Sequence, residues 1–79
     1  MIDLITVHVH LFASLYRNPG DSHQILELQA RTSVRDIVER LELPEMEIHL
    51  VFVNGRVALL DRILQDGDRL ALFPPIGGG

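Results

Sequence analysis

The three glycines at the carboxyl end, Gly77, Gly78 and Gly79, occupy the position in this chain that most suggests a chemical role. Glycine loses the most backbone entropy on ordering and buries no side chain, so three consecutive glycines do not favour packing. A backbone without Cβ atoms can instead enter a narrow channel in another protein. The group delivered there would be the α-carboxylate of Gly79, which becomes an acyl donor once one of its oxygens is made a leaving group. A frayed chain end is the alternative interpretation.

The residues before the glycines form an apolar strand that runs into two prolines. Proline has no N–H and fixes φ near −65°, so the sheet ladder is expected to end at about Phe73. Pro74-Pro75 then favours an extended polyproline conformation. We therefore predict a folded body over residues 1–73 and a flexible glycine-rich tail over residues 74–79. The tail can reach at most about 20 Å from the body.

Other residue types offer weaker chemistry. His8 and His10 place two imidazoles on one face of a strand, a spacing that metal ions can use. No third ligand is evident, and His23 and His49 stand alone, so no metal site is predicted. The sequence contains no recognisable Ser-His-Asp array and no phosphate-binding loop. These observations identify no catalytic centre within the chain.

The composition restricts the class of protein. A length of 79 residues predicts one domain. A net charge of −4 argues against binding to nucleic acid or to anionic membranes. The absence of cysteine excludes disulfides and thiol nucleophiles, and the absence of lysine excludes self-linkage through a side-chain amine. The first residues do not resemble a signal peptide and no stretch is long enough to span a membrane, so a cytoplasmic protein is expected.

Apolar residues that alternate with polar ones predict most of the strands. Near the amino end, every second residue from Ile5 to Leu11 is apolar and is expected to face the core, which leaves His8, His10 and Phe12 on the other face. Asn54-Gly55 is the strongest hairpin signal. The predicted strands cover residues 4–12, 24–30, 48–53, 56–58 and 69–73.

One helix is predicted between the second and third strands. Ser33 followed by Asp36 approximates a capping box, although Thr32 could equally be the cap. Pro44 marks the end of the helix. A further helical turn is possible over residues 59–64. The predicted buried stripe consists of Val34, Ile37, Val38 and Leu41, which recur at the spacing of one helix face.

This order of elements predicts an α+β domain in which the helix covers one face of a mixed sheet of four to five strands. Phe12 and Phe73 share the parity of the uncovered face, each near the end of its strand. If the first and last strands are parallel neighbours, the two rings lie side by side where the tail leaves the body. Exposed aromatic side chains at such a place predict a partner surface. The alternative is that the rings cover each other or pack under the loop of residues 13–23.

Five segments together resemble the ubiquitin-like sulfur carriers of cofactor synthesis, the MoaD/ThiS family, and most closely its molybdopterin synthase small-subunit (MoaD-like) branch. The most specific feature is the Phe-Pro-Pro step that runs into a terminal pair of glycines. The segments are Val-His-Leu-Phe-Ala (9–13), Thr-Ser-Val (32–34), Val-Asn-Gly (53–55), Leu-Gln-Asp-Gly-Asp-Arg-Leu (64–70) and Phe-Pro-Pro (73–75).

The resemblance implies a β-grasp fold and a defined reaction sequence. An adenylating enzyme similar to the ubiquitin-activating enzymes would use ATP to activate Gly79, and a sulfur donor would convert the acyl-adenylate to a thiocarboxylate. The large subunit of molybdopterin synthase would then pass the sulfur to a pterin precursor. The catalytic groups would belong to these partner proteins, and the chain itself would bind no cofactor and would be a carrier without turnover of its own. The partner-binding residues implied by the resemblance and by the strand parity are Phe12, Val57, Phe73, Pro74, Pro75 and Ile76.

Two alternatives remain at this point. The third glycine, Gly77, departs from the usual ending of two, and thiamine sulfur carriers also end in Gly-Gly. Those carriers generally lack the Phe-Pro-Pro step, so the synthase branch is preferred over a thiamine route or another sulfur-transfer route. A ubiquitin-like binding module or protein modifier would have the same fold.

Overall fold

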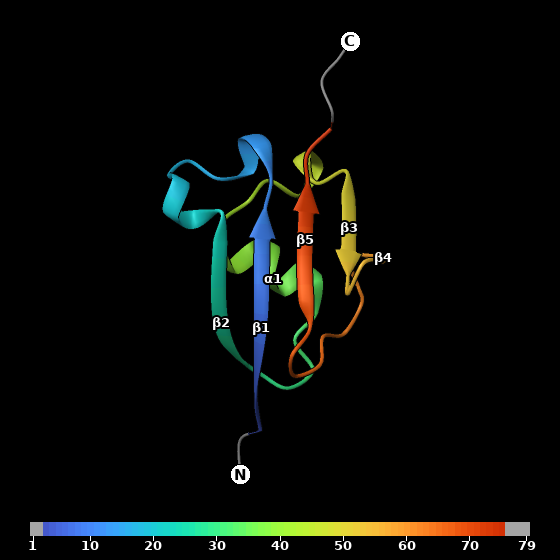
Figure 1. The fold of residues 1–79 in the computed structure, drawn as a ribbon. Helices are drawn as coiled ribbons and strands as arrows, with labels where there is room; N and C mark the ends of the chain where they lie inside the picture. Colours follow the sequence, from blue (N-terminus) through green and yellow to red (C-terminus); the bar gives the residue numbers. More distant parts are fainter. Residues whose placement is uncertain (1–2, 76–79) are drawn as a thin grey trace.

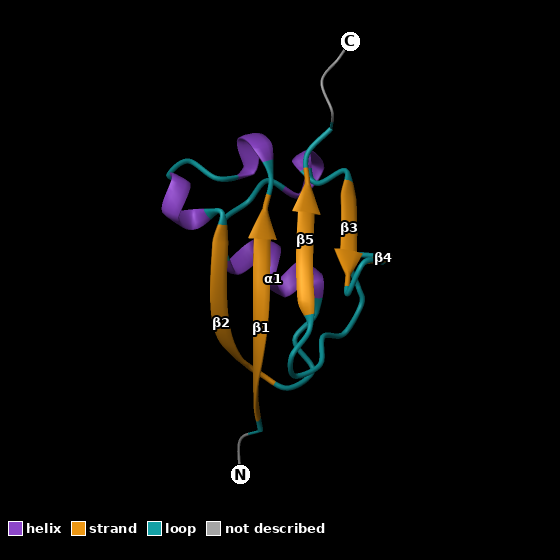
Figure 2. Ribbon diagram, in the orientation of Figure 1, coloured by secondary structure: helices purple, strands orange, loops and turns teal. Residues whose placement is uncertain are grey.

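The computed structural model describes residues 3–75 and shows a five-stranded mixed sheet with one α-helix packed against one face (Figure 1, Figure 2). This arrangement confirms the predicted α+β class. No helix among the described residues is long and apolar enough to cross a membrane. The elements are β1 (Leu4–Leu11), β2 (His23–Gln29), α1 (Val34–Arg40), β3 (Leu50–Val53), β4 (Arg56–Val57) and β5 (Arg69–Phe73).

The strand order is β2-β1-β5-β3-β4, so the first and last strands lie side by side in the middle of the sheet. β1 and β5 are parallel, with Val9 opposite Leu70 and Leu11 opposite Leu72. The other neighbouring pairs are antiparallel. These central inward side chains are fully or nearly fully buried, as their alternation predicted.

The helix begins at the predicted capping box. The Ser33 hydroxyl accepts the backbone N–H of Asp36 at 3.1 Å, and the Asp36 carboxylate accepts the backbone N–H of Ser33 at 3.0 Å. Thr32 is not the cap, because its hydroxyl donates instead to the carbonyl of Gln29 at 2.6 Å. The box satisfies two N–H groups that a helix start leaves without intrahelical partners.

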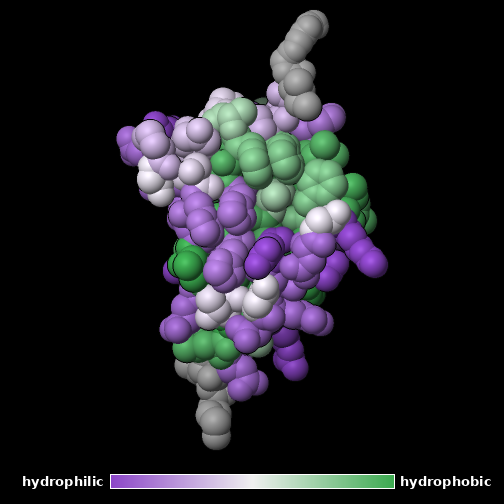
Figure 3. All heavy atoms as spheres, viewed as in Figure 1, coloured by the Kyte–Doolittle hydropathy of each residue, from purple (hydrophilic) through white to green (hydrophobic). Residues whose placement is uncertain are grey.

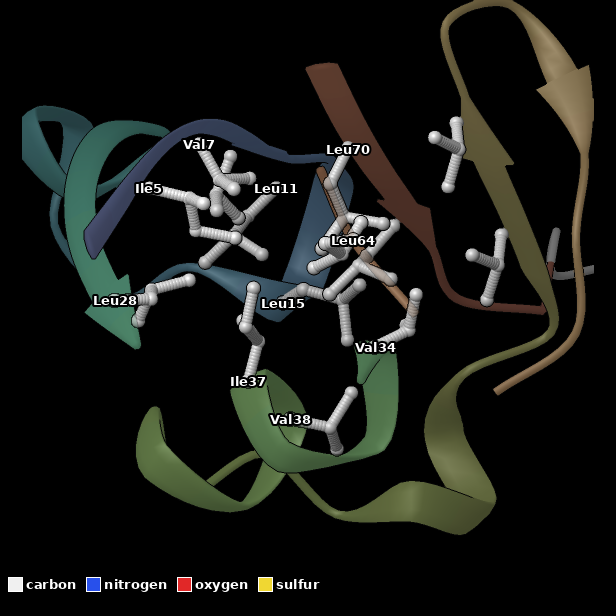
Figure 4. Close-up of a cluster of buried hydrophobic side chains, with 14 residues drawn as sticks. Ile5, Val7, Leu11, Leu15, Leu28, Val34, Ile37, Val38, Leu64 and Leu70 are labelled. Atoms are coloured by element: carbon white, nitrogen blue, oxygen red, sulfur yellow. The ribbon is translucent and has the colours of Figure 1, made fainter. Parts of the chain in front are cut away.

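The core lies between α1 and the covered face of the sheet (Figure 4). α1 contributes Val34, Ile37 and Val38, all buried. Leu41 caps the helix and is half-buried, and Glu42 with φ 57° turns the chain before Pro44. The predicted helical stripe is therefore confirmed at its first three positions and weaker at the fourth.

The segment of residues 59–64 is not helical, which corrects the suggested helical turn. Its backbone pairs with the start of α1: Val34 N–H donates to Arg62 O at 3.0 Å, and Leu64 N–H donates to Thr32 O at 2.9 Å. The segment contains one turn, in which Arg62 N–H donates to Leu59 O at 3.1 Å, and its hydrogen bonds to the helix start place Leu64 in the core with 2% of its surface exposed. The sequence of residues 59–64 alone does not reveal that backbone hydrogen bonds to the start of α1 compete with a helical turn.

The predicted hairpin at Asn54-Gly55 is confirmed. Both residues have positive φ, 53° and 82°, as a type I′ turn requires. β3 is shorter than predicted, because Ile48 ends the 3-10 helix Glu45–Glu47 and the strand begins only at Leu50.

Candidate functional site

An aromatic patch lies on the sheet face that α1 does not cover. We define it by Phe12, Phe52, Phe73 and Val57. The rings of Phe12 and Phe73 stack with centroids 4.3 Å apart and planes 11° apart. The ring of Phe52 meets Phe73 edge-on at 5.5 Å and 85°. Figure 3 shows apolar side chains gathered on this face near the end of β5. The prediction that Phe12 and Phe73 lie side by side is confirmed.

The two stacked rings cover each other only in part. Phe12 follows directly after β1, and its backbone N–H donates to the carbonyl of Leu72 at 3.2 Å, which holds it beside the end of β5. Its side chain stays 41% exposed. The rings therefore pack on each other, as the alternative interpretation expected, and still leave apolar surface exposed, whose role in partner binding stays a prediction.

Val57 joins the patch through the β3–β4 hairpin. It lies opposite Phe52 in the antiparallel pairing and is 67% exposed. Phe52 was missed from the sequence, because both faces of the predicted strand 48–53 are apolar and parity does not choose between them. The register set by the Asn54-Gly55 turn was the signal that pairs Phe52 with Val57.

The chain leaves the sheet at the carboxyl end of β5 (Figure 1), where Phe73 is part of the aromatic patch. The carbonyl of Phe73 accepts the N–H of His49 at 2.8 Å, and the ladder ends there. Pro74, the first residue of the predicted tail, is buried against the body, whereas Pro75 is exposed. Ile76, Gly77, Gly78 and Gly79 lie outside the described residues, so the roles assigned to them stay predictions.

A second group of side chains lies on the same face. The imidazole rings of His10 and His23 stack with centroids 4.2 Å apart, and His8 lies 5.9 Å from His23. The sequence did not connect His23 with the other two, because only the β1–β2 register places it opposite His10. Burial lowers the pKa of His10, and the neighbouring charges of His23, His8 and Arg69 lower it further.

These imidazoles are not arranged to hold a metal ion. The planes of His10 and His23 differ by only 11°, so their ring nitrogens do not converge on one point. An ion bound by imidazole must lie about 2.0–2.1 Å from each nitrogen. Among residues 3–75, no group of three histidine or acidic side chains is placed to hold a metal ion.

Comparison with solved structures shows close agreement over nearly the whole chain. Small archaeal modifier protein 1 from Haloferax volcanii is 27% identical with a TM-score of 0.73, covering 91% of this chain and 99% of that one. A putative molybdopterin converting factor subunit 1 from Pyrococcus furiosus is 29% identical with a TM-score of 0.70, with the same coverages of 91% and 99%. Subunits 1 and 2 of the molybdopterin-converting factor from Helicobacter pylori form a solved complex that matches at 21% identity and a TM-score of 0.58, covering 95% of this chain and 100% of that one.

Comparison with curated proteins found no match. The model of the ThiS family matches residues 9–79, which include the aromatic patch, the Pro74-Pro75 step and the glycine ending. The chain therefore belongs to the ThiS family, and it has the β-grasp fold that ubiquitin-like sulfur carriers and protein modifiers share.

Proposed function

We propose that this chain is the sulfur-carrying small subunit of a molybdopterin synthase, and that Gly79 holds the sulfur as a thiocarboxylate. The observation that supports this most is the position of the aromatic patch. Phe73 ends β5 inside the patch, and the Pro74-Pro75 step follows it at once. A protein that docks on the patch is therefore well placed to receive the chain end. Membership of the ThiS family and the likeness to small archaeal modifier protein 1 both support a carrier or modifier rather than an enzyme with turnover of its own.

The proposed chemistry has two steps. A carboxylate oxygen of Gly79 attacks the α-phosphorus of ATP on an adenylating enzyme, which forms an acyl-adenylate and releases pyrophosphate. A hydrosulfide then attacks the acyl carbon: a C–S bond forms, the C–O bond to AMP breaks, and the sulfur loses its proton to leave a thiocarboxylate. The chain has no cysteine, so no thiol of its own can trap the activated end. Partner proteins use both ATP and the sulfur donor. We place the reaction in the cytoplasm.

The large synthase subunit is the second proposed partner. The Phe-Pro-Pro step and the similarity to the Pyrococcus furiosus protein favour the molybdopterin route over the thiamine route. The solved complex from Helicobacter pylori supports a large-subunit partner by fold. Protein modification is the second candidate function, and the comparable similarity to small archaeal modifier protein 1 favours it.

Intact mass spectrometry tests the carrier function. The chain is incubated with ATP, a cognate adenylating enzyme and sulfide. We expect a gain of about 16 mass units as sulfur replaces one oxygen of the externally activated carboxylate. A variant with one alanine added after Gly79 is the matched control and should gain nothing, because its carboxylate is displaced. No gain with several cognate adenylating enzymes would disprove the carrier function.

The pathway is tested with the loaded protein. Incubation with a large synthase subunit and the pterin precursor should return the chain to its original mass, as the thiocarboxylate is hydrolysed to a carboxylate and its sulfur passes to the pterin. If the loaded chain instead forms covalent adducts with other proteins through their lysines, the modifier function is correct and the synthase assignment is wrong.

A further inference from the structure

The histidines beside the aromatic patch form a continuous surface with it. We name His8, His10, His23 and Arg69 the cationic cluster. His10 lies opposite His23 on one side and opposite Ala71 on the other. Ala71 in turn lies opposite Phe52, and Phe52 lies opposite Val57. One straight row of side chains therefore crosses all five strands on the uncovered face, from imidazole at one end to the aromatic patch at the other. Figure 3 shows polar side chains directly beside the apolar ones.

The close packing of the cluster follows from the strand pairing. The N–H of Leu11 donates to the carbonyl of Ser22 at 2.8 Å, so the next pair, His10 with His23, is a non-hydrogen-bonded pair. Side chains approach most closely at such pairs. Arg69 of β5 lies opposite His8 of β1, which adds a permanent positive charge to the same area.

The cluster has little negative charge around it. The side chains whose charges act on the pKa of His10 are those of His23, His8 and Arg69, and all three are basic residues. Two acidic residues lie near Thr6, two pairs beyond His8 and away from the aromatic patch: Glu27 of β2 lies opposite Thr6, and the Asp66 carboxylate accepts the N–H of Thr6 at 2.7 Å. Within residues 3–75, no hydrogen bond or ion pair joins a side chain of the cluster to a carboxylate. The chain as a whole has a net charge of −4, so this local excess of basic groups stands out.

We propose that the cationic cluster receives an acidic segment of a partner protein, while an apolar side chain of the same segment occupies the aromatic patch. Carboxylates would supply the negative charge that the cluster lacks, and the patch would supply apolar burial next to it. This inference does not depend on the sulfur chemistry, because it concerns only what docks on the sheet face.

Binding of this kind depends on pH. An imidazole is mainly neutral above its ordinary pKa of about 6.5 and cationic below it. A bound carboxylate favours the cationic form, so binding takes up protons. Affinity should therefore rise as the pH falls from 8 to 6. Arg69 stays charged throughout this range and gives a weaker, pH-independent contribution.

The test uses the full chain labelled with ¹⁵N and a capped peptide of two leucines followed by four glutamates. Titrations are followed by NMR at pH 8 and pH 6. An exposed ion pair changes affinity by up to about fivefold. We therefore expect about fivefold tighter binding at pH 6, with the largest shifts at His10, His23 and Arg69 together with Phe73. A peptide with four glutamines in place of the glutamates should bind more weakly and equally at both pH values.

Variants assign the effect to the cluster. The triple substitution H8Q/H10Q/H23Q should abolish the gain at pH 6, and the single substitution His23→Gln at an exposed position should reduce it. His49→Gln, at an exposed histidine outside the cluster, is the matched control and should keep the gain. The dispersed spectrum of each variant reports whether it is folded.

Several results would overturn the proposal. Equal binding of the glutamine peptide, or a pH effect that survives the triple substitution, would exclude carboxylate recognition by the cluster. Shifts confined to the opposite face would exclude the site. Tighter binding of an oligothymidine than of the acidic peptide, or self-association of the chain at pH 6, would assign the surface to another occupant.

Discussion

At the scale of a single residue, Phe73 links the aromatic patch to the point at which the chain leaves the sheet. Its ring contacts both Phe12 and Phe52, and its carbonyl receives the last ladder hydrogen bond before Pro74. The same residue therefore forms the middle of the aromatic patch and fixes where the chain leaves the sheet. Phe73 is half-buried on the outer face and is not part of the core, so a change there alters this surface without removing a core side chain.

We predict that Phe73→Asp weakens binding to the adenylating enzyme and to a large synthase subunit by at least about tenfold, because it puts a charge into an apolar contact of the kind that dominates interfaces. Binding is measured by isothermal titration calorimetry. The fold should survive, as judged by circular dichroism and by the cooperativity of unfolding.

Leu4→Asp is the matched control for this prediction. Leu4 is 53% exposed at the opposite end of β1, so the same substitution there should leave partner binding unchanged. If Phe73→Asp unfolds the chain, its ring belongs to the folding core. If both variants bind like the original protein, the patch is not a partner surface.

At the scale of elements, the β3–β4 hairpin is fastened to the start of β5. The side-chain amide of Asn54 donates to the buried carboxylate of Asp68 at 2.8 Å, and its carbonyl oxygen accepts the N–H of Arg69 at 2.9 Å. The second oxygen of Asp68 accepts the N–H of Gln65 at 2.8 Å. These bonds join two turns, and they determine where the hairpin presents the outer part of the patch.

We predict that Gly55→Ala lowers the free energy of unfolding by about 1 kcal/mol, because an L-residue with a Cβ resists the positive φ at that position. Gly55 has φ 82°, and a Cβ at this position would meet no heavy atom within 4 Å, so the cost comes from the backbone alone. Urea denaturation measures the change.

Gly20→Ala is the control for the turn. A Cβ at Gly20 also meets no atom within 4 Å, and its φ lies outside the positive region. This variant should be neutral or slightly stabilised. A loss at Gly20 as large as that at Gly55 would contradict the explanation from backbone conformation.

At the scale of the whole molecule, the two sheet faces differ in their response to pH. The covered face is apolar and packed on α1, whereas the open face concentrates imidazoles next to Arg69. Because the pKa of His10 is lower in the folded chain than in the unfolded chain, the unfolded state binds more protons near that pKa. Stability must therefore rise with pH through this range.

We predict that the free energy of unfolding decreases as the pH falls below about 6.5, the ordinary pKa of an unfolded histidine. His10→Gln should make the decrease smaller, because it removes the group whose protonation folding disfavours. Urea denaturation between pH 5 and pH 8 gives the measurement. His49→Gln should leave the pH dependence as it was, and an unchanged dependence in His10→Gln would contradict the assignment.

The sequence by itself determined the features that depend on residues close together along the chain. The capping box at Ser33, the positive-φ turn at Asn54-Gly55 and the inward face of β1 are all short-range patterns, because a helix start, a tight turn and a pleat each involve only a few neighbouring residues. The predicted strand over residues 69–73 agreed with β5 at both ends, since Asp-Gly before it and Pro74 after it limit its length.

Only the tertiary structure decided which distant residues meet. Phe52 enters the aromatic patch, His23 stacks on His10, and residues 59–64 form backbone hydrogen bonds with the start of α1. Each of these results depends on strand order and register, which are set by contacts between segments far apart in the sequence. The physical reason is that hydrophobic burial does not specify which segments pair, so a strand's neighbours are fixed only when the whole sheet packs on its helix.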